Sequence, residues 1–140
     1  MSLPFALQIF LFACIGVAME VVWTAFMDLP KNKSARLMGF SYLWMLPIYA
    51  SVPVLLRLLT GAVGGWPLAG RLALYVALVY AVEYSTGMIL RKATGACPWE
   101  YEYRGKRWAV HDLIRLDYAP AWATACFLFE RLYFTFNGIA

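Results

Sequence analysis

The sequence predicts an all-α integral membrane protein, a four-transmembrane-helix bundle with a short interfacial hairpin or loop between the third and fourth helices. Of its 140 residues, 63% are hydrophobic and 14% are charged, which leaves too little polar surface for a water-soluble domain of this size. Four apolar runs are long enough to cross about 30 Å of hydrocarbon. We therefore expect a single transmembrane domain over residues 1–140.

The same composition argues against several other classes of protein. Three cysteines do not make a disulfide framework, and a single histidine argues against histidine-rich metal sites, so we expect neither a metal nor a cofactor. A nucleic-acid-binding protein would need clustered, exposed basic residues. The sequence also lacks a phosphate-binding glycine loop and a nucleophile elbow. The expected location is a membrane crossed several times, which is the inner membrane if the source is bacterial.

The first two predicted spans lie in the N-terminal half of the chain, over residues 3–27 and 37–59. Each exceeds the roughly 20 residues that a helix needs at about 1.5 Å per residue. Pro47 and Pro53 fall inside the second span, where proline interrupts the hydrogen bonding of a helix. We expect either a kink beside a cavity or plain curvature there.

The last two predicted spans cover residues 72–90 and 118–136. The segment 60–71, which is rich in glycine and contains Pro67, is expected to turn at the membrane interface. Asp117 and Pro120 are residue types that commonly begin a helix, so they mark the start of the fourth span.

The connection over residues 91–117 is the sizeable polar segment of the chain. Within it, residues 99–110 alternate in polarity on both sides of an Arg-Gly pair at 104–105, which is typical of a short hairpin. This register places Tyr101 opposite Trp108. We expect the aromatic rings to lie at headgroup level or to cover the helix ends; alternatively, the loop is a lid over a substrate.

Basic residues predict the orientation, because cytoplasmic loops of membrane proteins are enriched in Lys and Arg. The first and third loops carry most of them, so we place both loops in the cytoplasm and both termini outside. The residues on the predicted cytoplasmic side are Lys31, Lys33, Arg36, Arg91, Lys92, Arg104, Lys106, Arg107 and Arg115, and those on the opposite side are Arg57, Arg71 and Arg131.

Glu20, Glu83 and Glu130 lie inside predicted spans. An ionisable residue there costs at least about 2.5–3.5 kcal/mol on insertion scales, so it indicates a function by default. Glu130 is followed by Arg131, and we expect these two to form a local or interhelical pair. Glu20 and Glu83 each lie about 12 Å inside the end of helices that run in the same direction, so we expect them at one depth.

Small residues accompany both of these carboxylates on their own helix faces, with Gly16 one turn from Glu20 and Gly87 one turn from Glu83. Such faces favour close helix packing. The two carboxylates could share a proton, bind a cation, or receive a polar headgroup or a cationic solute. Alternatively, they hold helices together through hydrogen bonds, or they act as acid and base in catalysis.

Asp117 has two interpretations. As a helix-start residue it would cap the fourth span. Alternatively, it enters from the same side as Arg91 and Arg115 and closes an ionic gate over the intramembrane carboxylates.

Two sequence stretches carry a family resemblance: Glu83-Tyr84-Ser85-Thr86-Gly87-Met88-Ile89-Leu90-Arg91 and Ala96-Cys97-Pro98-Trp99-Glu100-Tyr101. With these, the chain resembles the CmpB-like family called Putative ABC-transporter type IV, and it is especially similar to the small vertebrate transmembrane relatives of that family. Glu100 stands where the family commonly has aspartate. The resemblance implies a membrane component of a transport system, and it singles out Glu20, Glu83, Arg91, Trp99, Tyr101 and Asp117.

We therefore expect a small membrane protein that binds and translocates a small solute, an ion or a lipid headgroup, with no residue assigned to catalysis. Its expected partners are membrane lipids and a second copy of itself or another membrane subunit, and not nucleic acid. The alternatives are a membrane enzyme that modifies a lipid or an isoprenoid, and a structural subunit of a larger complex. The expected ligand-binding residues are Glu20, Glu83, Tyr84, Thr86, Arg91, Trp99, Tyr101 and Asp117.

Overall fold

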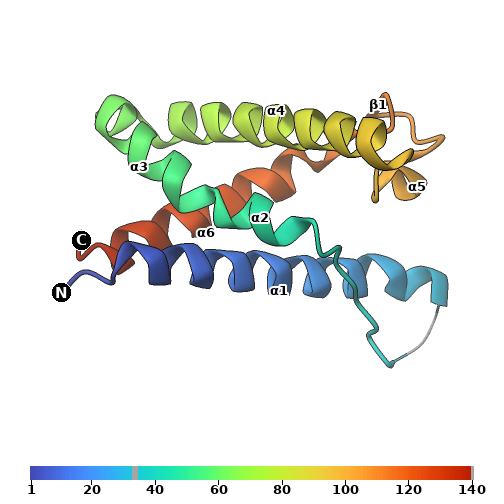
Figure 1. Cartoon of the computed structure of the whole chain (residues 1–140), viewed down its shortest axis with the longest axis horizontal. Helices are drawn as coiled ribbons and strands as arrows, with labels where there is room; N and C mark the ends of the chain where they lie inside the picture. The colour runs from blue at the N-terminus through green and yellow to red at the C-terminus, as the bar shows by residue number, and fades with distance from the viewer. Residues whose placement is uncertain (33–34, 140) are drawn as a thin grey trace. The chain divides into compact units, whose positions relative to one another are not determined.

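The computed structural model describes residues 1–32 and 35–139, and it is mostly helical (Figure 1). Lys33, one of the cations used to predict the orientation, lies outside the described residues. The elements in chain order are α1 (Phe5–Asn32), α2 (Met45–Ala50), α3 (Val52–Val63), α4 (Leu68–Thr94), α5 (Glu100–Tyr103), β1 (Ala109–Val110), β2 (Ile114–Arg115), the 3₁₀ helix η1 (Leu116–Tyr118) and α6 (Ala119–Phe136).

Three stretches of the described chain are long and apolar enough to cross a membrane. They are Phe5–Lys31, Met45–Val63 and Leu68–Thr94, and they indicate an integral membrane protein. Helix α6 covers the fourth predicted span but is not among these stretches. A fourth crossing therefore stays a prediction.

The second predicted span begins later than expected. Residues 37–44 are not helical, and the helical stretch starts at Met45. It is interrupted at Ser51, between α2 and α3. Pro53 in the first turn of α3 has no backbone N–H to donate to the preceding turn, which accounts for the break. The predicted interruption of this span by proline is confirmed.

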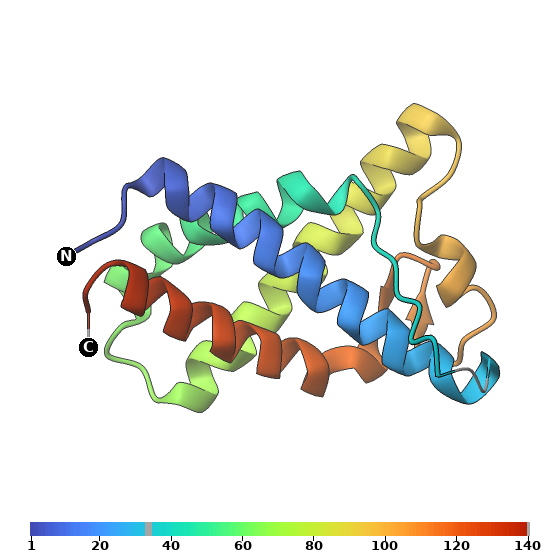
Figure 2. The same cartoon turned by 90° about the horizontal axis from the view of Figure 1, so that it is seen from below.

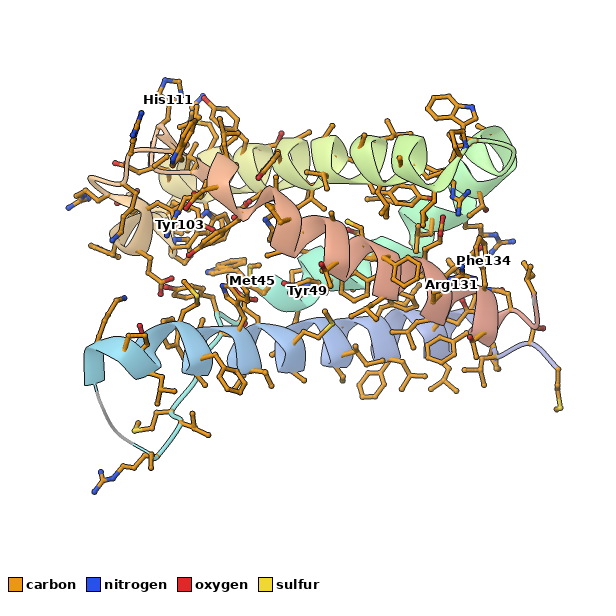
Figure 3. All side chains as sticks on the ribbon, turned by 180° about the vertical axis from the view of Figure 1, so that it is seen from behind. Met45, Tyr49, Tyr103, His111, Arg131 and Phe134 are labelled. Carbon is orange, nitrogen blue, oxygen red and sulfur yellow. The ribbon has the colours of Figure 1, made fainter. Side chains whose placement is uncertain are left out.

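The described residues form two compact units. The first consists of Met1–Ala62 and Leu132–Ala140. Its helix α2 packs on α1 through Met45 and Tyr49, both buried (Figure 3). A Cβ atom on Gly16 of α1 would lie 2.1 Å from Cγ of Tyr49, so glycine is required for this approach.

The two ends of the chain are joined within this first unit. The backbone N–H of Leu3 donates to the carbonyl of Phe136 at 2.7 Å. Gln8, of which 1% is exposed, forms a reciprocal amide pair with Asn137, with donor–acceptor distances of 3.2 and 3.1 Å. Because a buried amide needs partners for its donors and acceptor, this pair lets Gln8 sit in an apolar helix.

The second unit, Val63–Arg131, contains α4, the polar connection and the N-terminal part of α6. The antiparallel strands β1 and β2 pair Ala109 with Arg115 and Val110 with Ile114. Figure 2 shows these strands beside α5, and Figure 1 shows β1 near the C-terminal end of α4. Their tight turn has positive φ at His111 (51°) and Asp112 (57°), as a type I′ turn requires.

The hairpin predicted at 104–105 is therefore wrong in its position. Residues 100–103 are helical, and the strands lie further along the chain. The cause is a local cap: the carboxylate of Glu100 accepts a hydrogen bond from the backbone N–H of Cys97 at 3.1 Å, which supports a helical turn. Tyr101 and Trp108 are consequently not opposite one another on a ladder.

Candidate functional site

Glu83, in the C-terminal half of α4, is a buried carboxylate of the second unit; 7% of the residue is exposed. The hydroxyl of Tyr103 on α5 donates a hydrogen bond to Oε1 of Glu83 at 2.7 Å. Burial, and then the nearby Glu83 carboxylate, raise the pKa of Tyr103, so its hydroxyl stays protonated and remains a donor. The pair joins α4 to the polar connection that follows it.

Gly87 explains why this connection can lie against α4. A Cβ atom at Gly87 would be 2.9 Å from Cδ2 of Leu113, 3.1 Å from Cζ2 of Trp99 and 3.2 Å from Sγ of Cys97. The indole N–H of Trp99 donates to the carbonyl of Leu113 at 2.9 Å, which ties the two sides of the connection together. The close packing predicted from the small residue beside Glu83 is confirmed.

Arg91, at the end of α4, is bound by the same connection. Its Nε lies 3.0 Å from Oε2 of Glu100, and its Nη2 donates to the carbonyl of His111 at 2.9 Å. The Cys97 backbone hydrogen bond, and after it the Arg91 guanidinium, lower the pKa of Glu100. Arg91 therefore acts here as a brace between α4, α5 and the β1–β2 turn.

This brace predicts a pH dependence of stability. Because the pKa of Glu100 is lower in the folded state than its ordinary value of 4.5, its contribution to stability is complete above that value and is lost as the pH falls through the folded pKa. Thermal unfolding between pH 7 and pH 3 should show the wild type losing stability at the acidic end. Glu100→Gln should be less stable at pH 7 and should show a flatter acidic limb; an unchanged limb would contradict this assignment.

His111 is a neighbour that sequence reasoning gave no role. Its Nδ1 lies 2.8 Å from the hydroxyl of Tyr84 on α4, and both His111 and Tyr103 lie toward the C-terminal end of α4 (Figure 3). A positive φ is uncommon outside glycine, so the turn at His111 and Asp112 is held by contacts such as these. The sequence offered no hairpin signal here, because the turn lacks the usual Asn-Gly or Asp-Gly pair.

Asp117 pairs with Arg115 beside these residues. The Nε of Arg115 lies 3.1 Å from Oδ1 of Asp117, and its Nη2 also contacts Oδ2. Hydrogen bonding to Arg115 lowers the pKa of Asp117. The guanidinium of Arg115 also stacks 4.1 Å from the ring centroid of Tyr118. Asp117 and Arg115 thus form a local ion pair at the start of the 3₁₀ helix.

Glu20 lies in the first unit, with a partner of its own. Its Oε2 accepts a hydrogen bond from the hydroxyl of Ser41 at 3.0 Å. The segment containing Ser41 lies along α1, where Oγ1 of Thr24 accepts from the backbone N–H of Phe40 at 2.8 Å. Because Glu20 and Glu83 belong to different compact units, their pairing at one depth stays a prediction.

The remaining predicted residues make other contacts. The hydroxyl of Thr86 donates back to the carbonyl of Val82 at 2.6 Å, within its own helix. Tyr101 is 68% exposed, with the guanidinium of Arg104 lying 5.5 Å from its ring centroid. The C-terminal half of α4 therefore carries Glu83, Tyr84 and Arg91, and Trp99 packs beside Gly87 of the same helix, whereas the side chain of Tyr101 is exposed.

A buried ion pair that the sequence did not predict lies at the other end of α4. Glu130 of α6 is 0% exposed, and it accepts hydrogen bonds from Nε and Nη2 of Arg71 at 2.8 and 3.1 Å. The hydroxyl of Tyr75 adds a third hydrogen bond at 2.9 Å. We expected Glu130 to pair with Arg131, whereas these hydrogen bonds come from Arg71 of another helix. The guanidinium of Arg131 lies 5.3 Å from the ring centroid of Phe127.

Comparison with known proteins agrees with the apolar helices. The sequence model of the family described as Putative ABC-transporter type IV matches residues 7–137, which is nearly the whole chain. No solved structure matches it. The match and the three membrane-length helices support a role related to membrane transport. The chain belongs to the Putative ABC-transporter type IV family.

Proposed function

We propose that the protein binds and translocates a small solute, an ion or a lipid headgroup through an intramembrane carboxylate site in which Glu83 is the principal group. One observation carries this proposal. Glu83 lies within the candidate span Leu68–Thr94, is 7% exposed, and accepts a hydrogen bond from the buried hydroxyl of Tyr103. An acidic side chain at such a position costs several kcal/mol, and neutral hydrogen-bonding residues would join the same elements at lower cost.

The chemistry around Glu83 favours a ligand with positive charge. Tyr103 supplies a neutral donor to one carboxylate oxygen, so this hydrogen bond adds no positive charge beside Glu83. A proton, a metal cation or an ammonium group is attracted by a carboxylate, and an anion is repelled by it. Aromatic rings near the carboxylate would add a favourable interaction with a quaternary ammonium group.

Other charged residues have supporting positions in this proposal. Glu20 is a carboxylate of the first unit, on the candidate span Phe5–Lys31, and we propose separately that it contributes to ligand binding there, beside the hydroxyl of Ser41. Arg91 and Asp117 flank the entrance from the end of α4, and each is held by a partner of opposite charge within the second unit. These ion pairs keep both side chains fixed at the entrance.

Ligand-dependent stability tests this proposal at equilibrium. The full chain, purified in detergent, would be unfolded thermally in sodium, choline or ethanolamine chloride, with ionic strength held constant by N-methylglucamine chloride. A probe that binds the folded protein raises its stability by about 2.7 kcal/mol at 100 times its dissociation constant. We expect at least one probe to raise the unfolding temperature of the wild type but not that of Glu83→Gln.

Glu102→Gln is the matched control, because it removes an equal charge from an exposed position on α5. It should respond to the probe as the wild type does. The proposal is contradicted if no probe stabilises the wild type, or if Glu83→Gln is stabilised equally.

A further inference from the structure

The connection after α4 exposes a cluster of basic and aromatic side chains, which we name the basic–aromatic loop and define as Tyr101, Arg104, Lys106, Arg107 and Trp108. Residues 104–108 are exposed without interruption. Tyr101 is 68% exposed, Trp108 is 53% exposed, and 62% of the Arg104 side chain is exposed. The loop therefore presents two large rings and three cations to its surroundings.

The rings and the cations of this loop are arranged as pairs. The guanidinium of Arg104 lies 5.5 Å from the ring centroid of Tyr101, and that of Arg107 lies 5.4 Å from the ring centroid of Trp108. Each pair combines an amphipathic ring with a permanent positive charge. Tyr and Trp are enriched where a membrane meets water, so exposed rings carrying cations suit that boundary better than bulk water.

The acidic residues nearby do not remove this positive charge. Glu100 is buried and accepts its closer hydrogen bond from Arg91 at 3.0 Å, whereas Arg104 lies 3.5 Å from its other oxygen. In the sequence, Glu102 lies between Tyr101 and Arg104, so it adds one negative charge to the loop. The three cations at 104, 106 and 107 therefore leave the loop with a net positive charge.

The position of the loop in the second unit places it at a membrane surface. Helix α4 supplies a candidate span that ends at Thr94, and α5 begins six residues later, at Glu100. Figure 1 shows α5 and β1 toward the C-terminal end of α4. The last turn of α4 also carries Arg91 and Lys92. A loop that begins so few residues after the end of a spanning helix stays near the headgroups.

We propose that the basic–aromatic loop binds anionic phospholipid headgroups in the leaflet at the C-terminal end of α4. Its cations bind the phosphate groups, and the rings of Tyr101 and Trp108 lie among the headgroups. Basic segments beside a membrane gain about 1 kcal/mol for each Lys or Arg from an anionic surface, which corresponds to roughly fivefold in affinity. This lipid site is separate from Glu83, so it does not depend on the transport proposal.

The charge requirement is tested by lipid titration of the full chain in a non-ionic detergent, with native mass spectrometry to count bound phosphatidylglycerol or phosphatidylcholine. Arg104→Gln with Arg107→Gln should weaken phosphatidylglycerol binding on the order of 10- to 30-fold and leave phosphatidylcholine binding unchanged. Arg57→Gln with Arg131→Gln removes an equal charge from two residues predicted to lie on the opposite side of the membrane and should change the affinity less than twofold. Equal loss in both double variants, or equal wild-type binding of the two lipids, overturns the proposal.

Quenching of the fluorescence of Trp108 by lipid gives a second measurement, which does not need the charge variants. The protein contains six tryptophans, so the difference between the wild type and Trp108→Phe isolates the signal of this residue. Phosphatidylglycerol with brominated chains should quench this signal at a lower mole fraction than brominated phosphatidylcholine. Identical quenching curves, or quenching that is unchanged in Trp108→Phe, overturns the proposal. Thermal unfolding confirms that each variant is folded.

Discussion

Arg71→Met should destabilise the protein more than Glu83→Gln, Glu100→Gln or Glu102→Gln does. The change leaves the carboxylate of Glu130 fully buried and removes two of its three hydrogen bonds, so that the bond from the hydroxyl of Tyr75 remains. Leaving one charge of a buried pair uncompensated costs about 3–5 kcal/mol. We expect a loss of this size in the free energy of unfolding, measured by denaturant titration in detergent.

A double variant separates the buried charge from a loss of packing. Arg71→Met combined with Glu130→Gln removes both charges but keeps an acceptor for the hydroxyl of Tyr75. Replacing a buried ion pair with neutral groups is often close to neutral for stability, so the double variant should recover most of the loss. If the double variant is as unstable as Arg71→Met, the buried charge of Glu130 is not the cause.

Glu83→Gln should lower the transport rate by at least an order of magnitude while leaving the protein folded. The amide keeps the size of the side chain and an acceptor for the hydroxyl of Tyr103, but it cannot carry the charge that compensates a bound cation. An uncompensated cation in a low-dielectric site is strongly disfavoured. The initial rate of sodium or choline uptake into proteoliposomes measures the effect, at equal protein content per vesicle.

The hydropathy pattern predicted helix α6 and most of helix α4, because both are apolar along most of their length. Helix α6 starts at Ala119 and ends at Phe136, one residue from the predicted start and at the predicted end. Helix α4 is longer than the predicted span of residues 72–90, because Arg71, Arg91 and Lys92 are helical yet interrupt an apolar run. A charged residue ends a hydrophobic pattern without ending a helix, since Arg and Lys are good helix formers.

Tertiary hydrogen bonds explain the part of the second span that hydropathy predicted incorrectly. Residues 37–44 are apolar enough to resemble the start of a helix, but they are not helical, and hydrogen bonds hold part of the segment against α1. Thr24 bonds the backbone of Phe40, and a Cβ atom at Gly39 would lie 1.9 Å from the carbonyl oxygen of Val21. These partners are distant in sequence, so a local pattern contains no sign of them.

The candidate site, too, was predicted only in part from the sequence. The cost of a carboxylate in an apolar helix identified Glu83, and the small residue one turn away correctly indicated close packing. Tyr103 was missed, because a tyrosine in a polar loop is unremarkable until the fold brings it to the carboxylate. Arg71 was assigned to a turn at the membrane interface, and its partner Glu130 is 59 residues away. A single sequence marks a buried charge but does not identify its partner.

The central claim is that a cation binds at Glu83 while the protein translocates it across the membrane. Transport currents from proteoliposomes adsorbed on a solid-supported membrane test this claim most directly. Wild type, Glu83→Gln and Glu102→Gln would be compared at matched protein density after rapid exchange from N-methylglucamine to sodium or choline. The account predicts a saturable current for the wild type and Glu102→Gln and its loss in Glu83→Gln. A current of wild-type size in folded Glu83→Gln would contradict the account.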